Sequence, residues 1–341
     1  MKSSRIFRLS QEAVVGILLL VICAVVGVFS PSFISFATLF EMVRGSLAFA
    51  IMGLGVLPVL IAGEVNLSFC SVAAFSAFAT HHLLLRLGYQ GGIGMYLILS
   101  GLMGSLAGWV MGVIVTRFKL RVFPVSLGFW MFWYGMNLFV ISPIINFTLP
   151  PGLVGYYSRY IVTVQDPVIG VSGLHEAIIY LLAMALLMWF FLRYTMMGRG
   201  LYAVGGNREV AVRIGYNVGK ILTIALVLSG ALSGIAGVIQ CSFYRYFTPT
   251  LFRGQELSVL TAVVIGGASL EGGRGSVLGT ILGVFFIQVV TRSLVYLGVK
   301  GEYQQFVLGL MLIIFFVASS IKRKPRPEKM AKLEEDTQGG R

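Results

Sequence analysis

The sequence predicts an all-α membrane protein with about ten transmembrane helices and both termini in the cytoplasm. Of its 341 residues, 57% are hydrophobic and only 11% are charged, whereas a soluble domain carries about 25% charged residues. The charge is also uneven, because 11 of the 39 Lys, Arg, Asp and Glu residues lie within 322–341. Long apolar runs fill most of the remainder. This composition excludes a soluble enzyme, a disordered chain, a coiled coil and a disulfide-stapled scaffold.

Ten apolar segments approach the length of about 20 residues that crosses a hydrocarbon core about 30 Å thick. They are 13–29, 44–62, 68–86, 93–116, 123–142, 176–193, 221–241, 257–270, 277–297 and 303–321. No small-residue cleavage site follows the first segment, which favours an uncleaved helix over a signal peptide. The eighth segment is short and rich in glycine, so it is the least independent of the ten.

The Lys and Arg residues orient these segments. With the N-terminus inside, 19 of the 26 cations fall in predicted cytoplasmic segments and 7 in external ones, as the positive-inside rule requires. The split accounts for the net charge of +13 through loops held near anionic membrane lipid. No nucleic acid is needed as a partner.

The predicted organisation has three parts. A cytoplasmic N-terminus, 1–12, precedes a transmembrane domain, 13–321, and a disordered cytoplasmic tail, 322–341, follows it. Within the domain, the external loop 146–175 contains Tyr156, Tyr157 and Tyr160. These aromatic side chains are interpreted either as a belt at the membrane interface or as a docking surface for a partner.

Small residues recur at four-residue spacing, which lets helix backbones approach closely. Packing within the chain is favoured over a dimer seam for each stripe. The stripes are Gly104, Gly108 and Gly112, then the pairs Gly230 with Gly234 and Ser233 with Gly237, then Gly275, Gly279 and Gly283.

The cytoplasmic segment 197–216 carries the clearest local signal. Asn207 is suited to cap a helix of about residues 208–214, and Glu209 and Arg213 form an i,i+4 pair in the favourable order. Val210 and Ile214 form a small apolar face beside Ala211. Gly215 is a natural stop. Because so short a helix is unstable alone, it packs on its own membrane domain, on lipid or on another protein.

This segment resembles the coupling segment of permease subunits of ATP-binding-cassette (ABC) sugar importers, the ribose, xylose, arabinose and galactoside group. The family pattern is roughly G-R-x-x-Y-A-x-G-x-N-x-x-A-A-x-x-x-G. Two further blocks, Glu256 to Ser276 and Pro124 to Gly128, are similar to family blocks in the same order. The resemblance implies that the ATPase-coupling residues are Gly198, Arg199, Tyr202, Ala203, Gly205, Gly206, Asn207, Glu209, Val210, Ala211, Arg213 and Gly215.

One block departs from the family pattern G-G-I-D-L-S-V-G-S. Here Glu64 and Cys70 replace glycines and Asn66 replaces an aspartate. Interrupted apolar segments often mark non-helical backbone that lines a cavity. Asn66, Ser68 and Ser71 are therefore the candidate lining of a translocation path.

The resemblance implies a multi-pass protein of the bacterial inner membrane that imports a sugar or sugar-like solute. Its implied partners are ABC ATPase subunits, which bind the ATP, a second permease copy or a paralogue, and an extracytoplasmic solute-binding protein. No cofactor belongs to the chain itself. The 3 cysteines and 3 histidines show no metal-ligand spacing, and no catalytic constellation is present. A secondary carrier or channel that works without an ATPase is the alternative.

Overall fold

The structure is a computed structural model that describes residues 11–29, 33, 35–166 and 170–300, with 303, 304, 306, 307, 309, 310 and 313. The chain divides into two units, 1–298 and 299–341, and the helical bundle belongs to the first. The predicted tail 322–341 and most of the tenth span, 303–321, lie outside the described residues. So do residues 1–10 of the predicted N-terminal segment.

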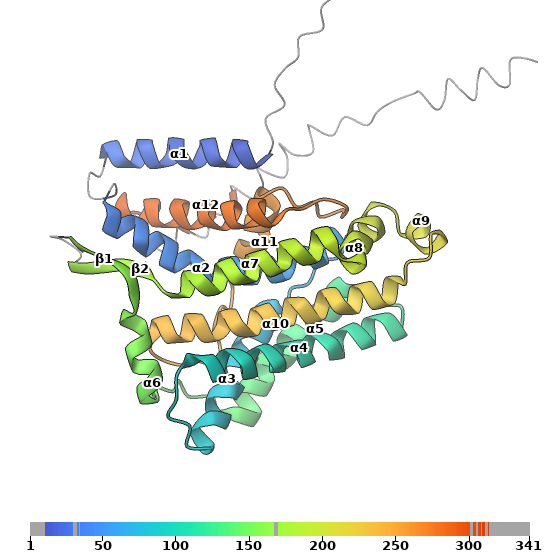
Figure 1. Ribbon diagram of the computed structural model, residues 1–341, viewed down its shortest axis with the longest axis horizontal. Coiled ribbons are helices and arrows are strands. Elements are labelled where there is room, and N and C mark those ends of the chain that lie inside the picture. The colour runs from blue at the N-terminus through green and yellow to red at the C-terminus, as the bar shows by residue number, and fades with distance from the viewer. Residues whose placement is uncertain are drawn as a thin grey trace, which may run out of the picture. The chain divides into compact units, whose positions relative to one another are not determined.

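Each of the other nine predicted spans coincides with a helix (Figure 1). These helices are α1 (Gln11–Phe29), α2 (Phe36–Ile61), α3 (Phe69–Arg86), α4 (Ile93–Arg117), α5 (Val122–Met136), α7 (Ala177–Tyr194), α10 (Val218–Tyr244), α11 (Glu256–Ile265) and α12 (Val277–Tyr296). A π-helical turn, Asn137–Ile141, extends α5. The chain is thus a largely α-helical, multi-pass membrane protein, as the sequence predicts.

Six helical segments of the described chain are long and apolar enough to cross a membrane. They are Phe36–Ile61, Ile93–Arg117, Val122–Ile141, Ala177–Tyr194, Val218–Tyr244 and Val277–Tyr296. α11 is shorter than predicted: it has 10 residues rather than reaching residue 270. At about 1.5 Å per residue it is half as long as the hydrocarbon core is thick.

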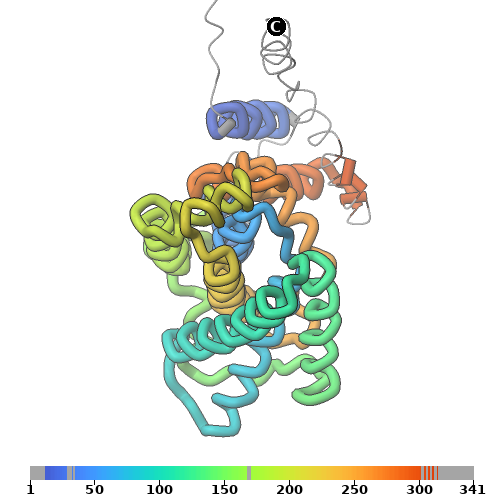
Figure 2. Tube along the Cα trace, turned by 90° about the vertical axis from the view of Figure 1, so that its right-hand side faces the viewer, coloured from blue at the N-terminus to red at the C-terminus, as the bar shows by residue number. Residues whose placement is uncertain are grey.

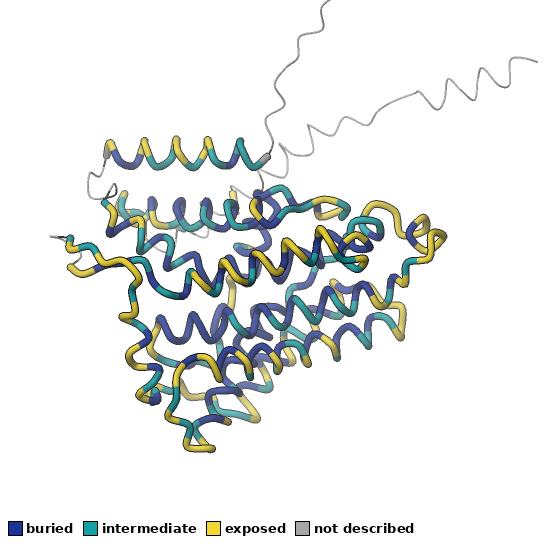
Figure 3. The backbone as a smooth tube through the Cα atoms, viewed as in Figure 1, coloured by how far each residue is buried: buried dark blue, intermediate teal, exposed yellow. Residues whose placement is uncertain are grey.

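α2 and α10 form the centre of the helical bundle, and buried residues concentrate on them (Figure 3). The glycine stripes allow α4 and α10 to touch backbone to backbone. A Cβ on Gly108 would lie 2.1 Å from the Leu226 carbonyl oxygen, and one on Gly230 would lie 2.0 Å from that of Gly104. The stripes therefore serve packing within the chain.

The loop 146–175, which the sequence assigns to the outside, is more ordered than a plain loop. It contains the short helix α6 (Pro151–Val154) and an antiparallel hairpin of β1 (Tyr160–Asp166) and β2 (Gly170–His175). This hairpin is an addition to the all-α fold that the sequence predicts, and it forms because Ile161 to Val164 is rich in β-branched residues that favour a strand.

The hairpin and the segment 197–216 lie at opposite ends of the bundle, since α7 runs its full length between them (Figure 1). This segment, which the sequence assigns to the cytoplasm, folds into α8 (Met196–Gly206) and α9 (Arg208–Arg213). Viewed from the end in Figure 2, α5 and α7 stand at opposite sides of the bundle.

Candidate functional site: the coupling segment

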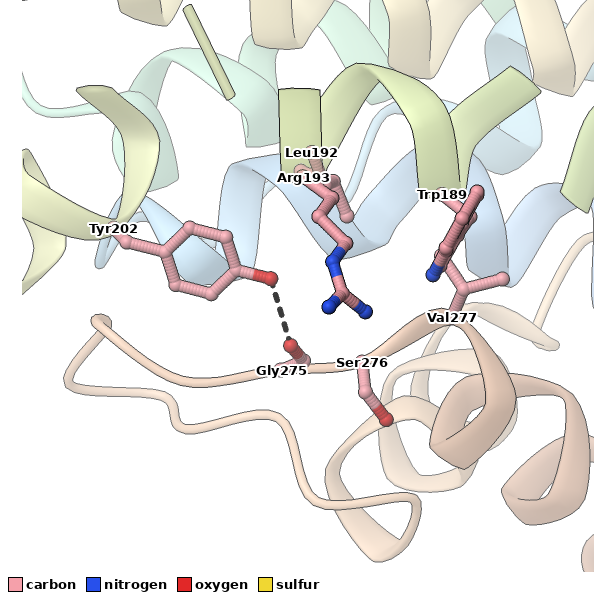
Figure 4. A pocket seen from close by; sticks show the side chains of 7 residues that line it. All are labelled: Trp189, Leu192, Arg193, Tyr202, Gly275, Ser276 and Val277. Carbon is pink, nitrogen blue, oxygen red and sulfur yellow. Dashed lines mark hydrogen bonds between the residues drawn. The ribbon is translucent and has the colours of Figure 1, made fainter. Parts of the chain in front are cut away.

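α8 is the part of the predicted coupling segment, 197–216, that packs against the membrane helices. Its first turn is capped by Thr195, whose hydroxyl oxygen accepts from the Gly198 N–H at 2.9 Å. The Tyr202 hydroxyl donates to the carbonyl of Gly275 at 2.9 Å (Figure 4). This bond ties α8 to the glycine-rich turn that precedes α12.

Gly205 lies at the tightest contact of the segment. A Cβ there would lie 1.8 Å from the Ile61 carbonyl oxygen at the end of α2 and 2.5 Å from the Gly273 nitrogen. Gly273 in turn donates to the same Ile61 oxygen at 2.8 Å. Because only glycine fits, the end of α2, the end of α8 and the turn at 272–275 meet as three backbones in contact.

α9 confirms the short capped helix that the sequence predicts. The Asn207 side-chain oxygen accepts from the backbone N–H groups of Glu209 and Val210, at 3.0 and 3.1 Å. Gly215 ends the helix with φ +92°, a conformation that glycine adopts without strain. Glu209 and Arg213, expected to pair, are instead both exposed.

The apolar side chains of α9 are uncovered. Val210 and Ile214, one turn apart, are 49% and 64% exposed, and Val212, on another side of the helix, is 58% exposed, whereas Ala211 is buried against the bundle. The charged residues of the segment, Arg199 among them, are also exposed. The described chain thus presents an apolar tip with a charged surround at the end that the sequence assigns to the cytoplasm.

Glu64 connects this tip to the bundle. Its side chain is 14% exposed and pairs with Arg208, the first residue of α9, at 3.6 Å. Its other carboxylate oxygen accepts from the Val122 N–H at 3.2 Å, at the start of α5. The departure from glycine at this position therefore adds a direct link between α9, α5 and the turn after α2.

The three candidate path residues lie together but are buried. Asn66, Ser68 and Ser71 are 4%, 1% and 0% exposed. The Asn66 side-chain oxygen accepts from both the backbone N–H and the hydroxyl of Ser68, at 2.9 and 2.8 Å. Residues 64–67 are non-helical, so the interruption that the sequence predicts is present, and these bonds support it internally.

Cation–π contacts hold the loop 146–175, predicted to be external, against the bundle. The guanidinium groups of Arg44 and Arg245 lie 4.0 and 3.9 Å from the ring centroid of Tyr157, one from α2 and one from the end of α10. Cation–π contacts of this kind contribute about 0.5–2 kcal/mol each. Tyr156 is fully buried, so the loop aromatics are not a simple interfacial belt.

Glu256 is a residue whose setting the sequence did not reveal. It looked like a carboxylate at the edge of a span, yet it is 8% exposed and accepts from the Trp130 indole N–H at 2.7 Å. The partner lies in α5, far away in sequence, so no local pattern could show the pairing.

Comparison with known proteins gives a consistent result. A family model described as the branched-chain amino acid transport system / permease component matches residues 38–316. The ribose import permease protein RbsC of Escherichia coli is 29% identical over 325 residues, 94% of this chain and 96% of that protein. The fructose import permease protein FrcC of Rhizobium meliloti is 27% identical over 317 residues, 90% of this chain and 85% of that protein.

The galactose/methyl galactoside import permease protein MglC of Escherichia coli is 26% identical over 322 residues, 92% of this chain and 95% of that protein. No solved structure matches the chain. Among the described residues, no group of three or more His, Cys, Asp or Glu side chains is placed to hold a metal ion.

Proposed function

Because this chain belongs to the family of permease components of branched-chain amino acid transport systems, it is a membrane transport subunit rather than an enzyme, and we propose that it imports a sugar or sugar-like solute. The relatives named as ribose, fructose and galactoside import permeases support this solute class. The proposed location is the bacterial inner membrane, with ten spans and both termini in the cytoplasm.

The observation that carries the proposal is the set of uncovered apolar side chains on α9, namely Val210, Val212 and Ile214. Burying one such side chain against a partner contributes about 1.5–3 kcal/mol. We propose that an ATPase subunit covers these side chains and binds the ATP, so that the permease itself holds no cofactor. A carrier that works alone has no use for an apolar tip outside its bundle.

The contacts of α8 connect α9 mechanically to the membrane helices. Gly205 touches the end of α2, and Tyr202 holds the turn before α12. A displacement of α8 and α9 by the ATPases would therefore move the inner ends of two long helices together. ATP binding shifts the orientation of the permeases only by its differential affinity for the two states.

The remaining partners follow from the same arrangement. We propose that the ordered external loop, 146–175, receives a solute-binding protein, and that a second permease copy or paralogue completes the path. The path passes the interrupted segment at 64–67. Asn66, Ser68 and Ser71 would reach solute there only when that segment moves, because their side chains are buried in this conformation.

The test replaces Ile214 with aspartate. Ile214 is 64% exposed, so Ile214→Asp leaves the bundle intact while it puts a charge on the docking face. Copurification of the ATPase and ATP-dependent uptake in vesicles should both fall by at least about tenfold, since ~1.4 kcal/mol corresponds to that factor.

Ile161→Asp is the matched control for copurification, because Ile161 is 52% exposed on the hairpin at the opposite end. It should leave the ATPase bound. Uptake that continues on an ion gradient without ATP would instead support the carrier alternative.

A further inference from the structure

The segment between α10 and α11 is irregular, yet its hydrogen bonds place part of it at the middle of the bilayer. The Tyr134 hydroxyl donates to the Leu251 carbonyl at 3.0 Å, and the Trp130 indole N–H donates to Glu256 Oε1 at 2.7 Å. Trp130 and Tyr134 are the ninth and thirteenth residues of the 20-residue span Val122–Ile141. Residues 251–256 therefore lie near the midpoint of that span.

Polar groups are exposed on the subunit at this depth. Arg253 and Gln255 are exposed on either side of Gly254, and Glu256, which follows them in the chain, is 8% exposed. An arginine that faces lipid at the bilayer centre costs about 2.5–3.5 kcal/mol on insertion scales. Non-helical backbone at membrane depth is tolerated only where protein buries it or where it lines a water-filled cavity. This face of the subunit is therefore turned away from lipid.

The backbone of the segment is also strained. Phe252 has φ +61°, and a bulky residue in the left-handed region is a genuine outlier. Phe252 is held there by its edge contact with the ring of Phe49, with the centroids 5.4 Å apart. Such strain persists only where the surroundings enforce it and is concentrated at ligand-binding and switch regions.

We propose that Arg253, Gln255 and Glu256, together with Trp130, form a solute-binding wall at the mid-depth of the translocation path. The inference rests on the proposed function and adds the residues that recognise the solute. A second permease closes the path on the open side of this wall.

The side chains indicate the class of solute. The Glu256 carboxylate has about four acceptor sites, so it keeps some beyond those that Trp130 and Tyr134 use. Gln255 both donates and accepts, and Arg253 donates. Hydrogen bonds from hydroxyl groups to a carboxylate are charge-assisted and strong. With one cation and one anion side by side, the wall suits a neutral compound rich in hydroxyl groups.

The first experiment tests whether water reaches the proposed solute-binding wall. Gln255→Cys is made in a chain whose Cys23, Cys70 and Cys241 are replaced by alanine, and the assembled transporter is treated in vesicles with a membrane-impermeant cationic thiol reagent. Because only the thiolate reacts and a lipid-facing thiol does not ionise, Gln255→Cys should react at least about tenfold faster than a lipid-facing cysteine.

Leu186→Cys is the matched lipid-facing control. Leu186 lies midway along Ala177–Tyr194 and is 64% exposed, and α7 stands at the side of the bundle opposite α5 (Figure 2). Reaction of Gln255→Cys at the same rate as Leu186→Cys would overturn the proposal.

The second experiment measures recognition with Glu256→Gln. The amide oxygen still accepts from Trp130, so the fold is kept while the charge is removed. The KM should rise roughly tenfold for whichever of radiolabelled D-ribose, D-fructose and D-galactose the unaltered transporter accumulates with ATP. ATPase copurification should not change.

An unchanged KM would overturn the role of Glu256. The thiol reaction needs neither ATP nor solute. A transporter that accumulates none of these sugars with ATP would therefore count against the proposed function alone, and the wall would still be judged by Gln255→Cys.

Discussion

At the scale of single residues, two of the three positions that depart from the family pattern, Glu64 and Asn66, have specific partners in the fold. Glu64 replaces a glycine and pairs with Arg208 while it accepts from the Val122 N–H. Asn66 replaces an aspartate, keeps the oxygen that bonds Ser68, and gains an amide nitrogen 3.5 Å from the Ser229 hydroxyl. At both of these positions, the surroundings supply hydrogen-bond or charge partners for the polar side chain.

His175 makes the stability of the folded loop 146–175 depend on pH. Its ring is 1% exposed, Nε2 donates to the Tyr156 carbonyl at 2.8 Å, and Nδ1 accepts from the Ala177 N–H at 3.0 Å. Burial, together with the nearby positive charge of Arg44, lowers the pKa of His175 from 6.5 to about 4. The fold therefore requires the neutral ring.

Because the folded pKa lies below the unfolded one, this stability is present above pH 6.5 and is lost as pH falls toward about 4. Each pH unit in that window removes up to about 1.4 kcal/mol. The melting temperature of the purified protein should fall between pH 7 and 5, and His175→Gln should flatten that dependence. An equally steep fall in the His175→Gln variant would contradict the assignment to this ring.

At the scale of elements, the glycine stripe of α4 sets how closely it approaches α10. Gly108→Ala would place a Cβ 2.1 Å from the Leu226 carbonyl oxygen. Neither helix backbone can give way cheaply, and overpacking of this kind typically costs about 1–3 kcal/mol or more. We expect a lower melting temperature and less folded protein in detergent, measured by fluorescence-detected size exclusion.

Gly94→Ala tests the same substitution in the same helix without the contact, because nothing lies within 4 Å of a Cβ there. It should be neutral or slightly stabilising, since alanine favours a helix over glycine by about 1 kcal/mol. Equal losses for Gly94→Ala and Gly108→Ala would show that helix contact is not the cause.

The sequence was informative about elements wherever one local signal determined them. Apolar length located the spans, and Asn207 located the start of α9. α8 was missed because its four glycines, Gly198, Gly200, Gly205 and Gly206, argue against a helix in isolation, whereas packing on the ends of α2 and α10 stabilises it. Thr195, which caps it, was the available signal.

Glu256 and the hairpin show the other kind of failure. The interior position of Glu256 depends on a partner in α5, more than a hundred residues away, and apolar periodicity has no information about such pairings. In the hairpin, β-branched residues in β1 pointed to a strand, but the tyrosines and prolines around them matched a loop equally well.

At the scale of the whole molecule, the two soluble segments lie at opposite ends of the bundle. The hairpin precedes α7 and the pair α8–α9 follows it, so one long helix separates them (Figure 1). A subunit with one end for a solute-binding protein and the other for an ATPase requires this arrangement. The distribution of Lys and Arg predicts which end is cytoplasmic.

That orientation is tested with two matched surface substitutions. Val171 in β2 and Val212 in α9 are 62% and 58% exposed, so Val171→Cys and Val212→Cys change little in the fold. In a chain without its native cysteines, a membrane-impermeant thiol reagent should label Val171→Cys in spheroplasts. It should label Val212→Cys only in inside-out vesicles.

Adding the ATPase to those vesicles should slow the labelling of Val212→Cys, because the proposed partner covers the exposed side chains of α9. The labelling of Val171→Cys in spheroplasts should stay the same with and without the ATPase. If Val212→Cys were labelled in intact spheroplasts instead, α9 would face outward. No cytoplasmic ATPase could then bind α9, and its exposed apolar side chains would have to bind a partner outside the cell.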